Sequence, residues 1–277
     1  MDDAGSLETQ YAMREEISYE DNTMLSFTPQ TRQGLHAAAQ VLLIAQLAGL
    51  PPLSNAQRYG LTALPNGLTT RRLSLNGQPA QLTLDYLRLE LVLTRGEEAR
   101  VVAITGKSTR ALLDALFDVR AELPADTVAR VQLSERPLMI DANDAARYAE
   151  VQWRMYTALA RLRARIIGAQ TPLLVWAHGF DVSTIWFAGQ TMEEHRDPHI
   201  NFGFSPGTPD VGQPYVFFYA TPVPSGLSAK LPAGMRWHTA WSVPGGVLPY
   251  DALTDNFEQQ VTDTLFEVYE TAAPLMV

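Results

Sequence analysis

Apolar residues recur at helical spacing in the first long segment of the chain. The pattern begins after Thr31, a candidate N-cap, and continues until Pro51, because proline cannot extend a helix. Alanine and leucine occupy most faces of this segment, so we predict a helix that is largely buried. A shorter helix is expected after Ser108, whose hydroxyl can cap it.

Two further helices are predicted in the second half of the chain. The longest covers residues 143–167, and its exposed face carries arginines near the C-terminal end, where the helix dipole favours cations. We interpret these arginines as a solvated face rather than an anion site. The last helix covers residues 254–272, where Asp255 and Glu258 have the spacing of a capping box.

Between residues 59 and 105 the period of apolar positions changes to two, which is typical of strands. Turn signals at Pro65-Asn66-Gly67 and Asn76-Gly77 separate the runs, which predicts an antiparallel meander. In the third run the apolar parity switches near Tyr86, which predicts a bulge or bend. The expected strands cover residues 59–64, 68–75, 81–93 and 101–105.

More strand-like runs follow, interrupted by turn-forming residues. They cover residues 128–133, 173–177, 182–188, 200–204, 215–221 and 237–243.

A weak internal repeat relates the two halves. The segments beginning at Ala63 and Ala177 align without gaps over a dozen residues at an offset of 114, and the same offset carries the first helix onto the longest one. We therefore predict an α+β protein of two similar halves, each an antiparallel sheet flanked by helices, that arose by internal duplication. The expected parts are a polar N-terminal arm (1–28), a first half (29–140) and a second half (141–277), with one continuous core joining the halves.

Composition narrows the class of function. The 277 residues are 46% hydrophobic and 18% charged, an ordinary globular balance, and the net charge of −9 argues against nucleic acid or an anionic membrane as partner. The absence of cysteine excludes disulfides and thiolate chemistry. The acidic N-terminus has no signal-peptide pattern, and no uninterrupted apolar run reaches the roughly 20 residues of a membrane span. We therefore expect a cytoplasmic protein.

An ordered set of motifs runs through the chain. It comprises His36, GLTT at 67–70, HGFD at 178–181, NFGFSPG at 201–207, PYVFFY at 214–219 and VLPY at 247–250. This set resembles a bacterial family of unknown function, DUF5996, over about residues 33–273. The resemblance implies one evolutionary unit, and it implies no catalytic residue, cofactor or reaction.

Residues able to do chemistry are concentrated between positions 171 and 207. His178 and Asp181 end one predicted strand, and the imidazole, with an ordinary pKa near working pH, is a candidate general base. With His195 and His199 from the following loop, the same pair could hold a metal ion, although no metal-ligand spacing motif is present. The alternative is structural: a satisfied histidine and a turn-capping aspartate.

Aromatic residues crowd the second half and are sparse in the first. We therefore predict that the second half binds a small organic molecule in an aromatic-lined pocket. A hydrolytic enzyme, based on histidine or a metal, at the same pocket and an interaction protein without such a site are the alternatives. A nucleophilic role for Ser205 is disfavoured because Pro206 prevents the helix that a nucleophile elbow needs. The candidate ligand-binding residues are Trp176, Trp186, Asn201, Phe204, Ser205 and Tyr219.

Overall fold

The computed structural model describes residues 28–131, 133–189 and 191–276. The predicted N-terminal arm thus lies outside the described residues except for its last residue. The first half comprises α2 (Pro29–Gly49), η2 (Ser54–Tyr59), β1 (Gly60–Leu64), β2 (Gly67–Thr69), β3 (Leu73–Leu75), β4 (Gln78–Asp85), β5 (Glu90–Arg95), β6 (Glu98–Ala103), α3 (Thr109–Leu116), α4 (Val119–Glu122) and α5 (Ala125–Ala129). The second half comprises α6 (Ala142–Arg165), β7 (Ala169–Gln170), β8 (Leu174–Trp176), β9 (Asp181–Phe187), β10 (His199–Ser205), β11 (Tyr215–Thr221), η3 (Leu227–Ala229), β12 (Arg236–His238), β13 (Gly245–Pro249), η4 (Tyr250–Ala252), α7 (Phe257–Ala272) and η5 (Ala273–Leu275).

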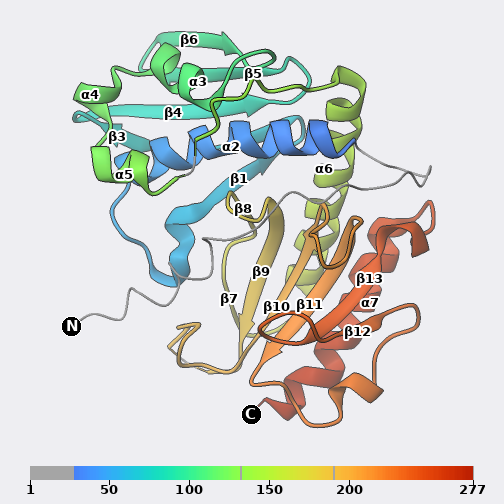
Figure 1. Cartoon of the computed structure of the whole chain (residues 1–277). Helices are drawn as coiled ribbons and strands as arrows, with labels where there is room; N and C mark the ends of the chain where they lie inside the picture. Colours follow the sequence, from blue (N-terminus) through green and yellow to red (C-terminus); the bar gives the residue numbers. More distant parts are fainter. Residues whose placement is uncertain (1–27, 132, 190, 277) are drawn as a thin grey trace.

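In the described part of the chain, one antiparallel sheet of 13 strands runs through both halves. Eleven of the strands follow the order β12-β13-β11-β10-β9-β8-β1-β2-β4-β5-β6, and the other two lie off this path, with β3 paired to β4 and β7 paired to β9. The halves join where β1 pairs with β8, with Gly60 opposite Trp176 and Leu61 opposite Val175. The first-half strands cross the top of the molecule and the second-half strands run down below them (Figure 1). The predicted α+β class is confirmed.

The order of elements agrees with the predicted repeat. Outward from the central pair, β1, β2, β4, β5 and β6 on one side correspond to β8, β9, β10, β11 and β13 on the other. A long helix precedes each central strand, and β1 and β8 begin 114 residues apart, at Gly60 and Leu174. Element order does not by itself establish a common origin, so duplication stays a prediction.

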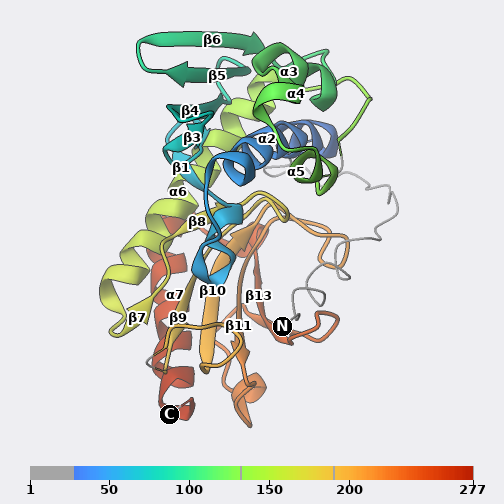
Figure 2. The ribbon, with the colours of Figure 1, turned by 90° about the vertical axis from the view of Figure 1, so that its left-hand side faces the viewer.

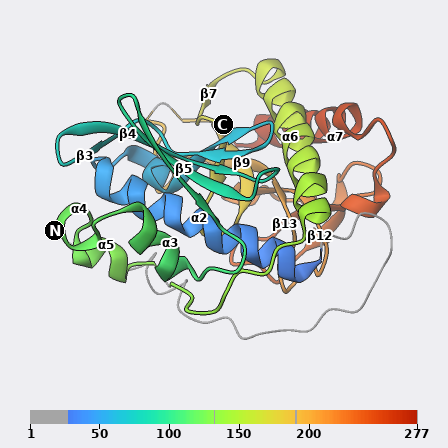
Figure 3. The same ribbon diagram turned by 90° about the horizontal axis from the view of Figure 1, so that it is seen from above.

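Helix α2 lies at the junction of the halves. It contacts β3 and β4 of the first half and also α6, which packs on β9 and β10 of the second. Figures 2 and 3 show α6 and α7 along one side of the second-half strands, with α2 crossing the end of α6. Twelve of its 21 residues are buried, which confirms the predicted burial of this helix.

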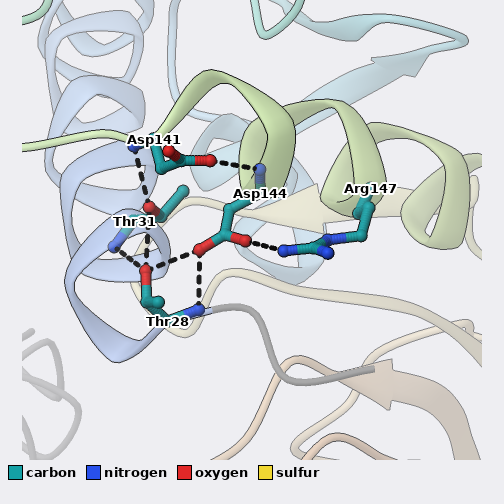
Figure 4. Close-up of polar contacts among 5 residues, drawn as sticks. All are labelled: Thr28, Thr31, Asp141, Asp144 and Arg147. Atoms are coloured by element: carbon teal, nitrogen blue, oxygen red, sulfur yellow. Dashed lines mark hydrogen bonds and ion pairs between the residues drawn. The ribbon is translucent and has the colours of Figure 1, made fainter. Parts of the chain in front are cut away.

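The N-termini of α2 and α6 cap each other (Figure 4). Thr28 accepts a hydrogen bond from Thr31 N at 3.3 Å and donates through its backbone N to Asp144 Oδ2 at 3.0 Å. Asp141 caps α6 by accepting from Asp144 N at 2.9 Å, and its own N donates to Thr31 Oγ1 at 3.0 Å. The predicted cap at Thr31 is therefore wrong, because Pro29 opens the helix one turn earlier.

A hollow of about 590 Å³ lies beside these caps. Its buried acid, Asp144, is already bonded to Thr28 and paired with Arg147. The residues that line the hollow include none of the predicted site residues, and its buried carboxylate already has partners.

The arginines of α6 do more than face solvent. Arg154 makes a bidentate ion pair with Glu258 of α7 at 2.7 and 2.8 Å and lies 3.8 Å from the Phe257 ring centroid. Arg165 pairs with α7 in a similar way. The prediction that these arginines form a solvated face is therefore wrong for Arg154 and Arg165, which bind α7. The predicted capping box is also wrong, because Glu258 pairs with Arg154 and the N-cap Asn256 makes no side-chain cap bond.

Several predicted strands are confirmed, including the run at 215–221, and Ser108 caps α3 as expected. The single strand predicted at 81–93 is wrong. It is the hairpin β4-β5, in which Leu89 has φ 54° and Asp85 Oδ1 accepts from the N–H of Leu87 at 2.9 Å. The parity switch therefore marks a chain reversal and not a bulge.

Three other expectations fail locally. The run at 68–75 is split into β2 and β3, and the strand predicted at 128–133 overlaps α5, which begins directly after Pro124. The run at 237–243 holds only part of β12. Strand β13 was not predicted because Gly245 and Gly246 weaken its strand signal.

A buried polar group at the helix–sheet interface gives a stability prediction. Gln152 of α6 is 1% exposed, and neither its amide N nor its amide O has a hydrogen-bond partner of good geometry. The nearby Tyr86 hydroxyl is also unpaired. Burial raises the pKa of Tyr86, and the Gln152 amide lies close enough to oppose this rise. Gln152→Met, which keeps the volume and removes the amide, is expected to raise the free energy of unfolding by about 1 kcal/mol.

Urea denaturation of both proteins measures this difference. The exposed position Gln259 provides the matched control, since Gln259→Met should change stability by no more than about 0.5 kcal/mol. A loss of more than 1 kcal/mol in the Gln152 variant would show that the amide has a partner in solution.

Candidate functional site

The turn between β8 and β9 carries the two predicted catalytic residues. It spans residues 177–180 and is closed by Trp176 opposite Asp181, with Phe180 N donating to Trp176 O at 2.7 Å. Phe180 has φ 59°, a conformation that residues other than glycine rarely adopt. The turn places His178 at its tip and Asp181 at the first position of β9.

Stacked rings hold this turn against both halves of the protein. The Phe180 ring, 1% exposed, lies 5.2 Å from His36 of α2 on one side and 5.2 Å from Tyr148 of α6 on the other. Tyr148 in turn meets Tyr86 of the β4-β5 turn edge-on at 5.6 Å. Packing on both sides of Phe180 therefore compensates for its strained backbone.

Three polar side chains one turn apart on α2 face the second half. Arg32 Nη1 donates to Pro206 O at 2.9 Å, and His36 Nε2 and Gln40 Nε2 both donate to Ala177 O, the former at 2.8 Å. The ordered set of motifs in the sequence contains His36, but sequence reasoning assigned no site role to any of the three. Their i, i+4, i+8 spacing within an otherwise apolar helix was the signal that could have identified them.

Burial shifts the two titratable groups of the turn in opposite directions. Loss of hydration, together with a smaller effect of nearby His36, lowers the pKa of His178 to about 4. Loss of hydration also raises the pKa of Asp181 to about 7, although its own backbone N–H opposes the shift. The prediction that the imidazole pKa lies near working pH is therefore wrong. The group whose pKa lies near pH 7 is the carboxyl group of Asp181.

Both groups are nevertheless reached by solvent. His178 is exposed and Asp181 is half-buried by accessible surface, whereas their pKa shifts indicate that protein surrounds them on most sides. A group can be crowded by protein on most sides and still be open to small molecules on one side. We use the term recess for this partly covered region around His178 and Asp181, where the β8-β9 turn meets α2 and α6.

Tyrosines from two other elements are influenced by the charge of Asp181. Burial raises the pKa of Tyr148, with Arg32 opposing the shift and the charge of Asp181 adding to it. Burial likewise raises the pKa of Tyr215, whose hydroxyl interacts with Ser205 and lies 3.3 Å from Thr208 Oγ1. The charge of the Asp181 carboxyl group adds to the rise of the pKa in both tyrosines.

The predicted ligand-binding residues lie on two opposite faces of the second-half sheet. Trp186 and Phe204 point into the main core beneath α6 and α7. The indole of Trp186 donates to Ile167 O at 2.8 Å, and Phe204 packs on Tyr250 at 6.3 Å. The prediction that all six residues line one pocket is therefore wrong, because the side chains of Trp186 and Phe204 pack in the main core.

The other four candidates share the face opposite α6 and α7, which we call the aromatic face. Its separate hydrophobic cluster consists of Tyr215, Phe217 and Val247, with Val211, Tyr219 and Trp241 packed against them. Asn201 donates to Tyr219 OH at 2.6 Å, and Trp176 Nε1 donates to Ser183 Oγ at 2.7 Å. Ser205 lies at the end of the face nearest Asp181, where its hydroxyl accepts from Gly207 N at 3.2 Å.

The four candidate metal ligands do not converge. His178 and Asp181 lie at the start of β9, whereas His199 pairs opposite Phe187 at its end, which over seven residues is about 20 Å away. His199 is 3% exposed and bonds Asp197 O at 2.9 Å, and His195 is exposed in the preceding loop. Among the residues that the structure describes, no three His, Asp or Glu side chains are grouped to hold a metal ion.

The buried bond between Trp176 and Ser183 provides a local test of the aromatic face. Both residues are nearly buried, so Trp176→Phe and Ser183→Ala are each expected to lower the free energy of unfolding by about 1–2 kcal/mol. Because each substitution removes the same bond, the double variant should cost about 1 kcal/mol less than the sum of the two singles. Additive losses in urea denaturation would show that the bond does not form.

Fold and site together define an α+β protein with one antiparallel sheet and a polar recess where its halves meet. The chain belongs to the family of unknown function DUF5996, whose family model matches residues 24–276. The resemblance seen in the sequence is thereby confirmed. No curated protein and no solved structure was found to match the chain. Within the described residues, none of the helices has the length and apolar character to cross a membrane.

Proposed function

We propose that this protein binds a small organic molecule in the recess around His178 and Asp181. The observation that carries the proposal is that both groups are reached by solvent while burial shifts their pKa values strongly. Titratable groups with strongly shifted pKa values cluster at binding and catalytic sites. A structural role rarely needs a carboxyl group that is both poorly hydrated and partly open to solvent. Asp181 has no hydrogen-bond partner from another residue among the described ones.

The chemistry of the recess favours a ligand with several hydrogen-bonding groups. Near pH 7 the imidazole of His178 is neutral, and the carboxyl group of Asp181 is present in both protonation states, so together they can donate and accept. Ser205 and Tyr215 add hydroxyl groups from the end of the aromatic face. A hydroxylated or amide-bearing molecule matches these groups.

Proton transfer is a second candidate function for the same recess. A carboxyl group whose pKa is about 7 is suited to act as general acid or base at neutral pH. In this version Asp181 transfers the proton, and His178 positions the substrate, which reverses the roles expected from the sequence. The supporting observation is the raised pKa of Asp181 together with its access to solvent.

Native mass spectrometry of freshly purified protein tests the binding proposal. We expect additional organic mass on the native protein that is absent from the denatured chain. Asp181→Asn and His178→Ala should lose this mass, whereas His195→Ala should keep it, because His195 is exposed near the opposite end of β9. A ligand retained by the Asp181 and His178 variants would place it elsewhere and reject the proposal.

Hydrolysis of p-nitrophenyl acetate tests the proton-transfer version. The expected rate depends on pH with a midpoint near 7, and Asp181→Asn removes both the rate and the midpoint. A midpoint unchanged by this substitution would assign the titration to another group.

A further inference from the structure

The sheet ends in the first half at an unprotected strand, β6. Among the described residues β6 pairs only with β5, and it is the uppermost element in Figures 1 and 2. Proteins usually protect an edge strand by making it short or by placing lysine, proline or a bulge in it. The strand at the opposite edge, β12, has only three residues. Strand β6 has six, pairs with β5 without a bulge and contains neither lysine nor proline.

The backbone of β6 presents hydrogen-bonding groups at this edge. Ile104 N donates to Leu89 O at 2.9 Å, which shows that the even-numbered residues of β6 are the ones that bond to β5. Successive residues of a strand direct their N–H and C=O groups to alternate sides. Ala99, Val101 and Ala103 therefore direct theirs away from β5, where the described chain supplies no further strand. A second extended strand could bond to all three residues.

The side chains of the same three residues form an exposed apolar row. Val101 is 54% exposed, and Ala99 and Ala103 are exposed as well. The charged side chain of Arg100 projects from the other face, where its Nη1 donates to Leu116 O of α3 at 2.9 Å. The outer face of β6 thus carries small apolar side chains and no charge.

The order of these side chains favours a second copy of the chain as the partner. Alanine stands two positions before and two positions after Val101, so the row is the same when it is read in either direction. A two-fold axis beside Val101 places this valine opposite Val101 of the second copy, and Ala99 opposite Ala103. Each hydrogen-bonded pair exchanges two bonds, so these three pairs supply about six.

Charges agree with this register. On the face towards α3 it places Arg100 opposite Val102 of the second copy and Glu98 opposite Ile104, so no two charged side chains lie directly opposite each other. A register shifted to centre on Arg100 would place two arginines opposite each other, which is destabilising.

The register also extends an apolar row of the outer face. Val92 of β5 pairs with Val101 within one chain. Joining two copies at Val101 brings the four valines into one row across both sheets, and β-branched neighbours of this kind stabilise strand pairs.

We propose that β6 is a dimer interface, at which two copies of the chain pair their β6 strands antiparallel about a two-fold axis beside Val101. The two sheets then form one continuous sheet. This interface goes beyond the proposed function, because it uses none of the residues of the recess.

Sedimentation velocity of the full chain between about 1 and 100 µM tests dimer formation over the range of moderate affinities. The unmodified protein is expected to approach twice the 30.6 kDa of one chain as the concentration rises. Val101→Lys places two like charges opposite each other and should weaken dimer formation by about tenfold or more. Lysine is a residue that natural edge strands carry, so this variant is expected to fold.

Two further variants identify the interface. Ile167→Lys is the matched control, because Ile167 is 82% exposed in the second half and should leave the dimer unchanged. Ala103→Pro removes an N–H that points to the free edge and leaves the bonds to β5 intact, so it should also weaken the dimer. A monomer at every concentration overturns the proposal, as does a dimer that Val101→Lys leaves unchanged. A dimer lost in Val101→Lys and kept in Ala103→Pro would show that the outer faces stack, and it overturns strand pairing.

A single cysteine tests the register. The chain has no cysteine, so Val101→Cys introduces a unique thiol. Hydrogen-bonded pairs of antiparallel strands have Cα atoms about 5.5 Å apart, within the range of about 4.4–6.8 Å that a disulfide spans. Mild oxidation is expected to link Val101→Cys into a covalent dimer and to leave Ile167→Cys monomeric on a non-reducing gel. No covalent dimer, or an equal yield in both variants, overturns the pairing at Val101.

Discussion

Phe180→Ala is expected to lower the free energy of unfolding by about 3–5 kcal/mol, as is usual for removing a fully buried aromatic side chain. The ring is 1% exposed and fills the space between His36 and Tyr148, each 5.2 Å away. Its loss opens a cavity between α2 and α6, the two helices that join the halves. Urea denaturation measures the effect, and a loss below 1 kcal/mol would mean that these rings do not hold the turn.

Phe180→Gly separates the role of the ring from that of the backbone. Both variants remove the ring, but glycine adopts the φ of 59° without strain and alanine does not. We therefore expect Phe180→Gly to be more stable than Phe180→Ala by about 0.5–1 kcal/mol. The reverse order would show that residue 180 leaves the left-handed region once the ring is removed.

Asp181→Asn is expected to stabilise the protein at pH 8 by up to about 4 kcal/mol, following from a pKa of about 7 in the folded state against 3.8 ordinarily. Between about pH 4 and pH 7 the folded state keeps a proton that the unfolded chain has lost. The unfolding free energy contributed by Asp181 therefore falls as pH rises through this window and is constant above it. Partial access to solvent makes 4 kcal/mol an upper limit.

The informative quantity is the stability difference between Asp181→Asn and the unmodified protein, measured at pH 4, 6 and 8. His178 contributes a pH dependence of opposite sign, because its pKa is lowered, and this contribution cancels in the difference. The exposed Asp114 provides the matched control, and Asp114→Asn should show no comparable change. A difference that does not grow between pH 4 and pH 8 would mean that Asp181 is not poorly hydrated in the folded protein.

Local pattern predicted the longer elements well because each is determined by residues close in sequence. The helix expected at 143–167 is Ala142–Arg165, and the strand expected at 215–221 is Tyr215–Thr221. The failures have local causes too. Strand β13 was missed because Gly245 and Gly246 weaken its strand pattern. Strands β4 and β5 were predicted as one strand because the turn between them has no strong turn signal in the sequence.

Part of the site could have been resolved further from the sequence. Strand side chains alternate between faces, so Asn201 and Phe204 of one strand had to lie on opposite faces and could not line one pocket. The polar positions of α2 could also be recognised from local periodicity, because Arg32 and His36 are one helical turn apart on a mostly apolar helix. What they contact was not visible, because no periodicity indicates a partner far away in the chain.

The sequence by itself determined the α+β class, the main helices, most strands, the family and the segment in which chemistry is concentrated. Tertiary structure alone decided that His36 bonds Ala177, 141 positions away, and that the two ends of β9 separate His178 from His199. It also decided the protonation behaviour of the recess, because the pKa of a carboxyl group depends on the hydration that its neighbours remove. Asp181 has an ordinary pKa in an extended chain, and only the assembled junction raises it to about 7.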